Sequence, residues 1–164
     1  MDYFFTPWRY QYIAKAAADA GGAESCIFCQ ALNGRDDAAS LIVFRGRECF
    51  VILNRFPYTS GHVMIAPMAH LDELQKLPPG AAHELMDLAQ RVEGILQRVY
   101  RPDGLNLGMN VGRAAGAGVA GHVHLHALPR WVGDTNFMTT TGESRVLPES
   151  LEQTWEKLRK EFSQ

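Results

Sequence analysis

Short apolar runs rich in β-branched and aromatic residues recur along the chain, and five of them are expected to form β-strands. These runs are SLIVFR (40–45), ECFVILN (48–54), HVMIAP (62–67), LNLGMNV (105–111) and HVHLHALP (122–129). The first two are separated only by Gly46 and Arg47, which predicts a β-hairpin. Pro67 should end the third run, because its ring nitrogen has no hydrogen to donate to a neighbouring strand.

A longer pattern between residues 78 and 102 has the three- and four-residue steps of an amphipathic helix. Its apolar stripe consists of Leu85, Leu88, Ala89, Val92, Ile95, Leu96 and Val99. Shorter helices are expected within 14–25, 70–77 and 147–162. This order of elements predicts the fold class α+β, with a five-stranded antiparallel sheet packed on one long helix plus a short helix.

The chain has 164 residues, of which 46% are hydrophobic and 21% charged, as expected for one globular domain. Its formal net charge is −2, and its lysines and arginines form no cluster that would predict binding to a long nucleic acid. No apolar run approaches the roughly 20 residues needed to cross a bilayer, and the start MDYFFTPWRY lacks the basic segment of a signal peptide. We therefore expect no membrane association and a cytoplasmic location.

Three of the six histidines, His122, His124 and His126, follow one another at two-residue spacing. Successive side chains of a strand point to opposite faces of the sheet, so these three imidazoles should share one face. The other face carries Val123, Leu125 and Ala127. These residues are small and apolar, so the long helix can cover them.

Three interpretations of this histidine face compete. Chance on a solvated strand would more often bring Thr, Lys and Glu to the polar face. Histidines at this spacing can bind zinc, but no Asp or Glu lies between Asp103 and Asp134 to support such a site. In nucleophilic catalysis, a neutral imidazole attacks phosphorus while its neighbours stabilise charge or deliver a proton. The preceding loop GRAAGAGVAG (112–121) favours catalysis, because its backbone N–H groups can closely approach a phosphate.

The segment HVHLHAL (122–128) resembles the signature of the histidine-triad (HIT) family of nucleotide hydrolases and transferases. The resemblance continues in FVILNRFPYTSGHVMIAP (50–67), in LNLGMNVG (105–112) and in the spaced residues PRW, GD and NF after the triad. It implies a single HIT domain over 1–164, made of an N-terminal extension (1–24), a HIT core (24–138) and a C-terminal tail and helix (139–164). TPWRY (6–10) is nearer to the branch of fragile-histidine-triad hydrolases and diadenosine tetraphosphate phosphorylases.

The resemblance implies roles for three histidines. His124 would be the nucleophile that attacks the α-phosphorus of a nucleoside polyphosphate and forms a nucleotidyl-histidine. His126 would contact the bridging or leaving atom, and His62 would be a buried partner that orients the triad. Water would then release a nucleoside monophosphate, whereas inorganic phosphate would make the reaction a phosphorolysis.

The same resemblance implies a nucleotide-binding set. Asn54 would bind ribose hydroxyls, Asn110 would line the nucleotide pocket, and Gly118 and Val119 would present backbone amides to the α-phosphate. Relatives commonly carry Gln or Ser where this chain has Gly118. Phosphate contacts would then come from the backbone or from Arg113.

Cys26 and Cys29 form a Cys-x-x-Cys pair, whose thiolates can bind one metal ion. By resemblance to bacterial HIT proteins, His70 and His122 would complete a structural zinc site with them. A redox pair and coincidence are the alternatives, although the βαβ pattern of thioredoxin-like proteins is missing. The third cysteine, Cys49, is expected to be a small buried apolar residue. No organic cofactor is expected.

The leading hypothesis is an enzyme, a HIT-type nucleotidyl hydrolase or phosphorylase that acts on a small nucleotide such as a diadenosine polyphosphate. One alternative is a catalytically weak adenine-nucleotide-binding module. Another is a zinc-dependent hydrolase that uses the triad as ligands. A homodimer is expected by family likeness, with Trp8, Tyr10 and Tyr12 as candidate contact residues.

Overall fold

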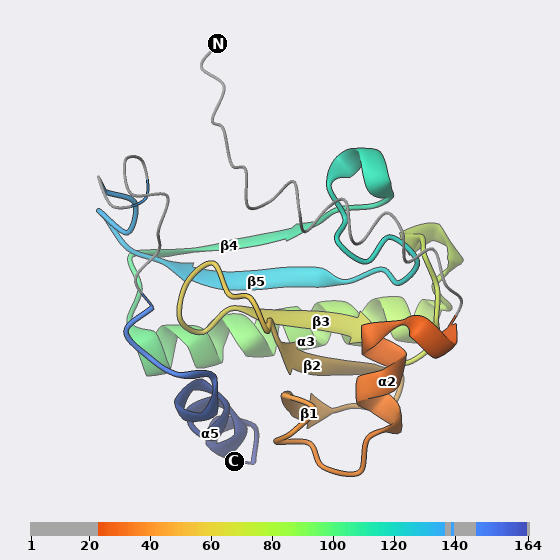
Figure 1. Ribbon diagram of the computed structural model, residues 1–164, viewed down its shortest axis with the longest axis horizontal. Coiled ribbons are helices and arrows are strands. Elements are labelled where there is room, and N and C mark those ends of the chain that lie inside the picture. Colours follow the sequence, from red (N-terminus) through yellow and green to blue (C-terminus); the bar gives the residue numbers. More distant parts are fainter. Residues whose placement is uncertain (1–22, 137–138, 140–146, 164) are drawn as a thin grey trace.

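One five-stranded antiparallel sheet organises the fold, and its strand order is β1-β2-β3-β5-β4 (Figure 1). The computed structural model describes residues 23–136, 139 and 147–163. The strands are β1 (Ile42–Arg45), β2 (Cys49–Leu53), β3 (Val63–Pro67), β4 (Gly104–Met109) and β5 (Leu125–Arg130). The helices are α2 (Ile27–Asn33), α3 (Pro79–Tyr100) and α5 (Leu151–Phe162), with 3-10 turns at Ala23–Ser25, Leu74–Lys76 and Arg113–Ala115. The predicted fold class and all five strands are confirmed.

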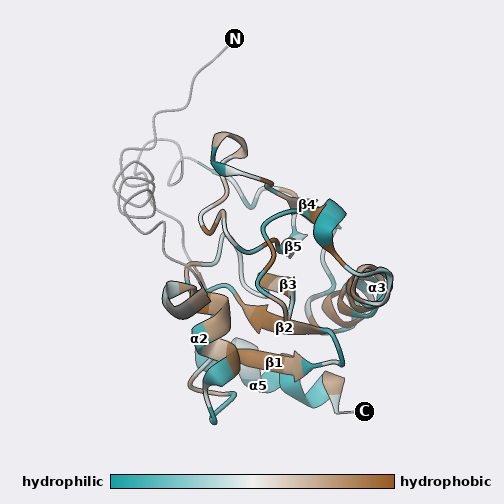
Figure 2. Ribbon diagram, turned by 90° about the vertical axis from the view of Figure 1, so that its right-hand side faces the viewer, coloured by the Kyte–Doolittle hydropathy of each residue, from teal (hydrophilic) through white to brown (hydrophobic). Residues whose placement is uncertain are grey.

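The long helix α3 covers one face of the sheet, and α2 lies on the other (Figure 2). The predicted stripe of α3 is buried from Leu85 to Leu96, and it packs on residues that include Val123, Leu125 and Ala127. A second apolar cluster lies on the α2 side and includes Phe28 and Phe50. The alternation along 122–127 therefore works as predicted, with the aliphatic residues facing α3.

One carboxylate on α3 holds the turn of the β1–β2 hairpin. Glu84 on α3 accepts the backbone N–H groups of Arg47, Glu48 and Cys49 at 2.9, 2.5 and 2.9 Å. Burial raises the pKa of Glu84, but these three donors outweigh it, so the pKa lies below its ordinary value. The sulfur of Cys49 is fully buried and donates to the carbonyl of Ala81, which confirms its expected place in the core.

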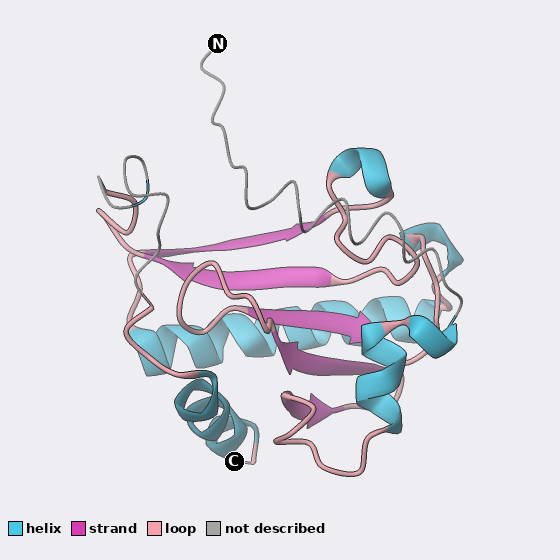
Figure 3. Ribbon diagram, in the orientation of Figure 1, coloured by secondary structure: helices cyan, strands magenta, loops and turns pink. Residues whose placement is uncertain are grey.

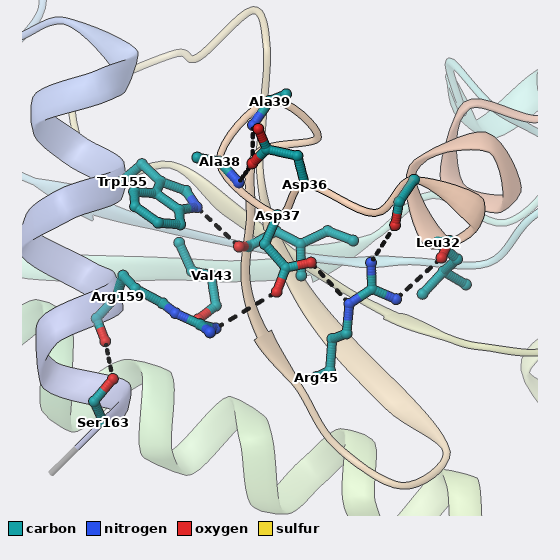
Figure 4. Close-up of polar contacts among 12 residues, drawn as sticks. Leu32, Asp36, Asp37, Ala38, Ala39, Val43, Arg45, Trp155, Arg159 and Ser163 are labelled. Carbon is teal, nitrogen blue, oxygen red and sulfur yellow. Dashed lines mark hydrogen bonds and ion pairs between the residues drawn. The ribbon is translucent and has the colours of Figure 1, made fainter.

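Helix α5 covers the free edge of β1 (Figure 4). Trp155 Nε1 donates to the carbonyl of Ile42 at 2.8 Å, and Arg159 donates to that of Val43 at 2.9 Å. Asp37 pairs with Arg45 at 2.9 Å and thereby joins the loop before β1 to the strand itself. These contacts occupy edge carbonyls of β1. Among the described residues, β4 is the strand at the opposite edge of the sheet.

The last strand and one short helix differ from their predicted extent, and a further predicted helix is largely untested. The last strand begins at Leu125 rather than at residue 122, because the segment before it bonds to the turn after β3. There the N–H of Val123 donates to the carbonyl of Leu71 at 2.6 Å, and the His122 ring bonds to the carbonyl of Pro67. The helix expected over 70–77 is reduced to a single 3-10 turn at Leu74–Lys76. Most of the helix expected within 14–25 lies outside the described residues, as do the candidate contact residues Trp8, Tyr10 and Tyr12.

Two loops between strands contain predicted site residues, and loops are drawn in pink in Figure 3. One loop, 54–62, joins β2 to β3, and the other, 110–124, joins β4 to β5. Gly61 ends the first loop with φ +81°, and a Cβ there would lie 2.7 Å from the ring of Tyr100. No helix in the described part of the chain is long and apolar enough to span a membrane.

Candidate functional site

Four histidines meet on the face of the sheet that carries α2. His126 lies on β5 opposite Met64 of β3, and His62 directly precedes β3. His122 and His124 precede β5 in extended chain. Their exposed fractions are 1% for His62, 0% for His122 and 3% for His124, and His126 is half-buried.

The imidazole rings form a contiguous group. The centroids of His124 and His126 are 4.9 Å apart, and those of His62 and His126 are 5.1 Å apart. The structure therefore brings together the three residues that the resemblance implied as catalytic.

Backbone contacts fix which nitrogen of His62 carries hydrogen. Its Nδ1 lies 3.2 Å from the backbone N–H of Tyr58, and a backbone amide can only donate. In the neutral ring the hydrogen is therefore on Nε2, which lies 2.9 Å from Nδ1 of His126. Because His126 accepts through Nδ1, its own hydrogen is on Nε2. His62 thus sets the donor atom of His126.

Carbonyl groups fix the other two histidines in the same way. Nδ1 of His124 donates to the carbonyl of His122 at 2.7 Å, which leaves a lone pair on Nε2. Nε2 of His122 donates to the carbonyl of Pro67 at 2.8 Å, which leaves a lone pair on Nδ1. The three triad histidines therefore present different atoms: a donor at His126, an acceptor or nucleophile at His124, and a ligand atom at His122.

Burial keeps these rings neutral. It lowers the pKa of His126 to about 4, and the neighbouring His124 contributes to the shift. Burial also lowers the pKa of His122 to about 4, against the opposing effect of its bond to Pro67. The pKa of His124 is lowered by burial as well. Near pH 7 the site offers uncharged imidazoles, which is the form in which a ring nitrogen can attack or bind a metal.

The side chains of Cys26, Cys29, His70 and His122 converge, with one ligand atom from each lying within 4.8 Å of the others. We call these four residues the metal group. Nδ1 of His122 lies 3.4 Å from the Cys26 sulfur and 3.7 Å from the Cys29 sulfur, and Nδ1 of His70 lies 3.5 Å from the Cys29 sulfur.

These spacings fit a tetrahedral zinc ion. Zinc–sulfur bonds of about 2.3 Å and zinc–nitrogen bonds of about 2.1 Å place sulfur and nitrogen about 3.6 Å apart at the tetrahedral angle. Burial and the neighbouring Cys26 raise the pKa of Cys29 to about 11, so a bound cation would have to displace the thiol protons. The donor set and its spacing thus suit zinc.

Of the four residues implied as nucleotide-binding, Asn54 and Val119 contact a site histidine. Oδ1 of Asn54 accepts the N–H of Phe56 at 3.0 Å, and its Nδ2 lies 3.4 Å from Nδ1 of His62. Asn110 directly follows β4, where Met109 is opposite Leu125 of β5. Asn54 therefore serves both its turn and His62.

The loop before the triad contributes the rest of this set. Gly118 is half-buried in it, and Val119 packs on the apolar cluster of Phe28 while its carbonyl accepts the N–H of His122 at 3.4 Å. Arg113 is exposed on the 3-10 turn at the start of the same loop.

Two residues of this site were missed from the sequence. Phe28 packs against His124 with centroids 4.9 Å apart, and Tyr58 packs against His62 with centroids 4.8 Å apart. The short aromatic Phe-x-Tyr motif after Asn54 was a usable signal for Tyr58. Phe28 stands inside the Cys-x-x-Cys pair, and a single aromatic residue there gives no sequence signal for a contact with His124.

An α+β fold with an antiparallel sheet, and a group of buried histidines on one face of that sheet, are the features of a histidine-triad protein. Residues 35–132 match the HIT domain family, so the chain belongs to the HIT family. The resemblance inferred from the sequence and the expectation of an enzyme of this family are thereby confirmed. The match begins after the Cys-x-x-Cys pair, and so leaves two members of the metal group outside it.

Individual relatives agree with this assignment. The chain is 36% identical over 162 residues to a protein named AP-4-A phosphorylase from Mycobacterium tuberculosis, covering 97% of this chain and 83% of that one. A zinc-bound histidine triad family protein from Mycobacterium smegmatis superposes with a TM-score of 0.69 at 27% identity, covering 87% and 96%. A hypothetical histidine triad nucleotide-binding protein from Sulfolobus tokodaii gives a TM-score of 0.67 at 25% identity, covering 84% and 92%.

Proposed function

We propose that the protein cleaves nucleoside polyphosphates, such as diadenosine polyphosphates, at the α-phosphate through a nucleotidyl-histidine on His124. The observation that carries this proposal is the tautomer pattern. His124 has its Nδ1 hydrogen bound to a carbonyl and its Nε2 lone pair available, while His126 carries a hydrogen on Nε2. The similarity to an AP-4-A phosphorylase supports the substrate class.

In the proposed first step, Nε2 of His124 attacks the α-phosphorus and the bond to the bridging oxygen breaks. The departing polyphosphate carries the developing negative charge, and Nε2–H of His126 donates a hydrogen bond to it. In the second step, water or inorganic phosphate attacks the same phosphorus, and an attacking water releases one proton to solvent. The phosphorus–nitrogen bond then breaks, and His124 leaves as neutral imidazole.

The nucleotide itself would be bound around these histidines. Asn54 and Asn110 would bind the nucleoside, and the backbone N–H groups of Gly118 and Val119 would bind the α-phosphate. Arg113 is exposed on the same loop and could add a positive charge. This assignment rests on the resemblance, and the contacts of Asn54 with His62 and of Val119 with His122 support it.

The metal group would hold a structural zinc ion through Cys26, Cys29, His70 and His122. Bound zinc would supply a cross-link between α2, the turn after β3 and the triad segment, with all four positions filled by protein. His122 would then take no part in proton transfer. The free cysteines suit a reducing compartment such as the cytoplasm, which we propose as the location.

We also propose a homodimer in which β4 pairs with the β4 of a second copy. This strand ends the sheet order, and Leu107 on it is 43% exposed. No strand in the described part of the chain pairs with the outer edge of β4, and such an edge readily pairs with another strand in a two-fold arrangement. Light scattering should give the mass of a dimer, and Leu107→Lys should shift it toward the monomer.

The test of the function is a trapping experiment with a dinucleotide labelled at the α-phosphate. Alkaline quenching should leave an acid-labile label on wild type and none on His124→Ala, whose turnover should fall by about three orders of magnitude or more. His83→Ala, at an exposed position on α3, is the matched control and should be labelled like wild type.

Equal labelling of wild type and His124→Ala would refute the mechanism. Binding without turnover would indicate a nucleotide-binding module instead. Loss of turnover by His124→Ala together with immediate loss of all chemistry on chelation would favour a metal-dependent hydrolase. Running the substrate panel with and without inorganic phosphate would separate hydrolysis from phosphorolysis.

A further inference from the structure

Phe28 joins the metal group to the proposed nucleophile. It lies on α2 between the two cysteines of the metal group and is fully buried. Its ring centroid is 4.9 Å from that of His124 and 5.0 Å from that of His122. An edge-on contact with Phe50 at 6.3 Å attaches the same ring to β2. One side of the His124 ring therefore packs on α2.

The first turn of α2 carries the two cysteines of the metal group, whereas the other end of the helix is held separately by Arg45 on β1. The helix has only seven residues, and its N-cap residue Cys26 makes no side-chain capping bond. A helix of this length is not stable on its own and needs tertiary contacts. Ile27 is 53% exposed, so it adds little to the packing of the helix on the sheet. A metal ion bound by Cys26 and Cys29 would fix the first turn, which is the turn that carries Phe28.

The backbone around His124 is held independently of α2. On one side of His124, the N–H of Val123 donates to the carbonyl of Leu71 at 2.6 Å, and on the other side Leu125 pairs with Ile65 in the sheet. What remains to be fixed is the rotation of the His124 ring. Its Nδ1 bond to the carbonyl of His122 fixes one atom, and the Phe28 ring packs on the imidazole itself.

We propose that Phe28 is a positioning residue through which the metal group holds the ring of His124 in the orientation for attack. Loss of the metal would loosen the first turn of α2, move Phe28 away from the imidazole and leave the His124 ring held only by its Nδ1 bond and its contact with His126. The catalytic consequence rests on the proposed function, whereas the structural coupling does not.

The kinetic test is a cycle that combines one substitution with metal removal. It measures kcat and KM, and metal content is determined for every sample. The zinc-loaded wild type is compared with chelator-treated wild type, and Phe28→Ala is compared in the same two states. Metal removal should lower the kcat of wild type about 10- to 100-fold, as does loss of groups that orient a reactive side chain. Phe28→Ala should keep one metal equivalent and show a similar fall.

Removing the metal from Phe28→Ala should then change kcat by less than about threefold, because the two losses act through one contact. KM should change little throughout. Phe28→Leu retains apolar bulk and should recover most of kcat. Leu32→Ala removes packing one turn further along the same helix face, and it should leave kcat near that of wild type.

A spectroscopic test needs no substrate. In protein with 13C-labelled histidine rings, the ring current of Phe28 should shift the Hε1 resonance of His124, and Phe28→Leu identifies that contribution. Chelation should remove most of this ring-current shift in wild type. In Phe28→Leu, chelation should leave the His124 Hε1 resonance unchanged. Phe28→Leu also covers the case in which Phe28→Ala does not fold.

Independent, multiplicative effects of metal removal and Phe28→Ala on kcat would overturn the proposal. So would a His124 resonance that does not respond to chelation, or a protein that binds no zinc. An effect of Phe28→Ala on KM alone would indicate a nucleoside contact instead. If wild type turns over no nucleotide, the proposed function fails, but the resonance test still decides whether the metal group positions His124.

Discussion

Lowering the pH from 7 to 5 should destabilise the protein, and His126 alone should account for about 2 kcal/mol of the loss. Burial, with a contribution from His124, lowers the pKa of His126 to about 4, against about 6.5 in an unfolded chain. Between these values the unfolded chain binds a proton that the folded chain does not. The free energy of unfolding therefore falls as the pH falls through this window.

The size of the effect follows from the window. The loss begins near pH 6.5, grows by about 1.4 kcal/mol per pH unit and levels off below about pH 4. At pH 5 this gives about 2 kcal/mol. The sign is that of a base with a depressed pKa: the folded state is favoured above pH 6.5 and penalised below it.

Urea unfolding followed by circular dichroism at pH 7, 6 and 5 measures this term in wild type and His126→Gln. The variant keeps the other buried histidines and the metal group, so their pH dependence cancels in the comparison. Wild type should lose about 2 kcal/mol more than His126→Gln between pH 7 and 5. His83→Gln, which changes an exposed histidine on α3, should follow wild type. Equal losses in wild type and His126→Gln would show that His126 is not held neutral.

Three further predictions concern stability. Glu84→Ala removes the acceptor of three backbone N–H groups in the β1–β2 turn and should cost about 2–3 kcal/mol at pH 7, measured by urea unfolding. The difference should shrink as the pH falls through the lowered pKa of the carboxylate, and a constant difference would contradict its role. Gly61→Ala introduces a Cβ 2.7 Å from an aromatic ring of α3 at φ +81° and should cost about 2–5 kcal/mol, whereas Gly108→Ala on β4 meets nothing within 4 Å. Equal melting temperatures for these two variants would refute the steric argument. Serine at both Cys26 and Cys29 should lower Tm by roughly 10 °C in zinc-containing buffer, and an unchanged Tm by calorimetry would count against bound metal.

Much of the fold could be predicted because its periodicities are long and consistent. The stripe on α3 extends over four turns, and the alternation from His122 to Ala127 separates two faces cleanly. Helix α2 could not be predicted in this way. It is less than two full turns, Cys26 is a poor N-cap residue, and the apolar Ile27 is exposed while Phe28 is buried. Such a segment takes its position from contacts with distant residues.

For the candidate site, the residues that come together could be predicted, but the tautomers of the histidines could not. The shared face of the triad followed from two-residue spacing, whereas the grouping of His62 with the triad and of His70 and His122 with the cysteines was implied by the resemblance to the HIT family. The tautomers depend on backbone groups supplied from elsewhere in the fold. The N–H of Tyr58 reaches His62 only because the loop 54–62 folds back, and the Pro67 carbonyl reaches His122 only because the strand ends there. Residue type and spacing carry no information about these directions.

Under the proposed mechanism, these backbone partners also give three identical side chains three different roles. All are kept neutral by burial, so none differs from the others in charge near pH 7. The difference lies in which nitrogen is already occupied: Nε2 in His122, Nδ1 in His124, and Nδ1 in His126 by acceptance from His62. In His124 the carbonyl partner on Nδ1 leaves Nε2 with a lone pair, so Nε2 can act as a nucleophile. In His126 the donor partner on Nδ1 places the hydrogen on Nε2, so Nε2 is a hydrogen-bond donor. The residues that determine the chemistry are therefore the partners behind the rings as much as the histidines themselves.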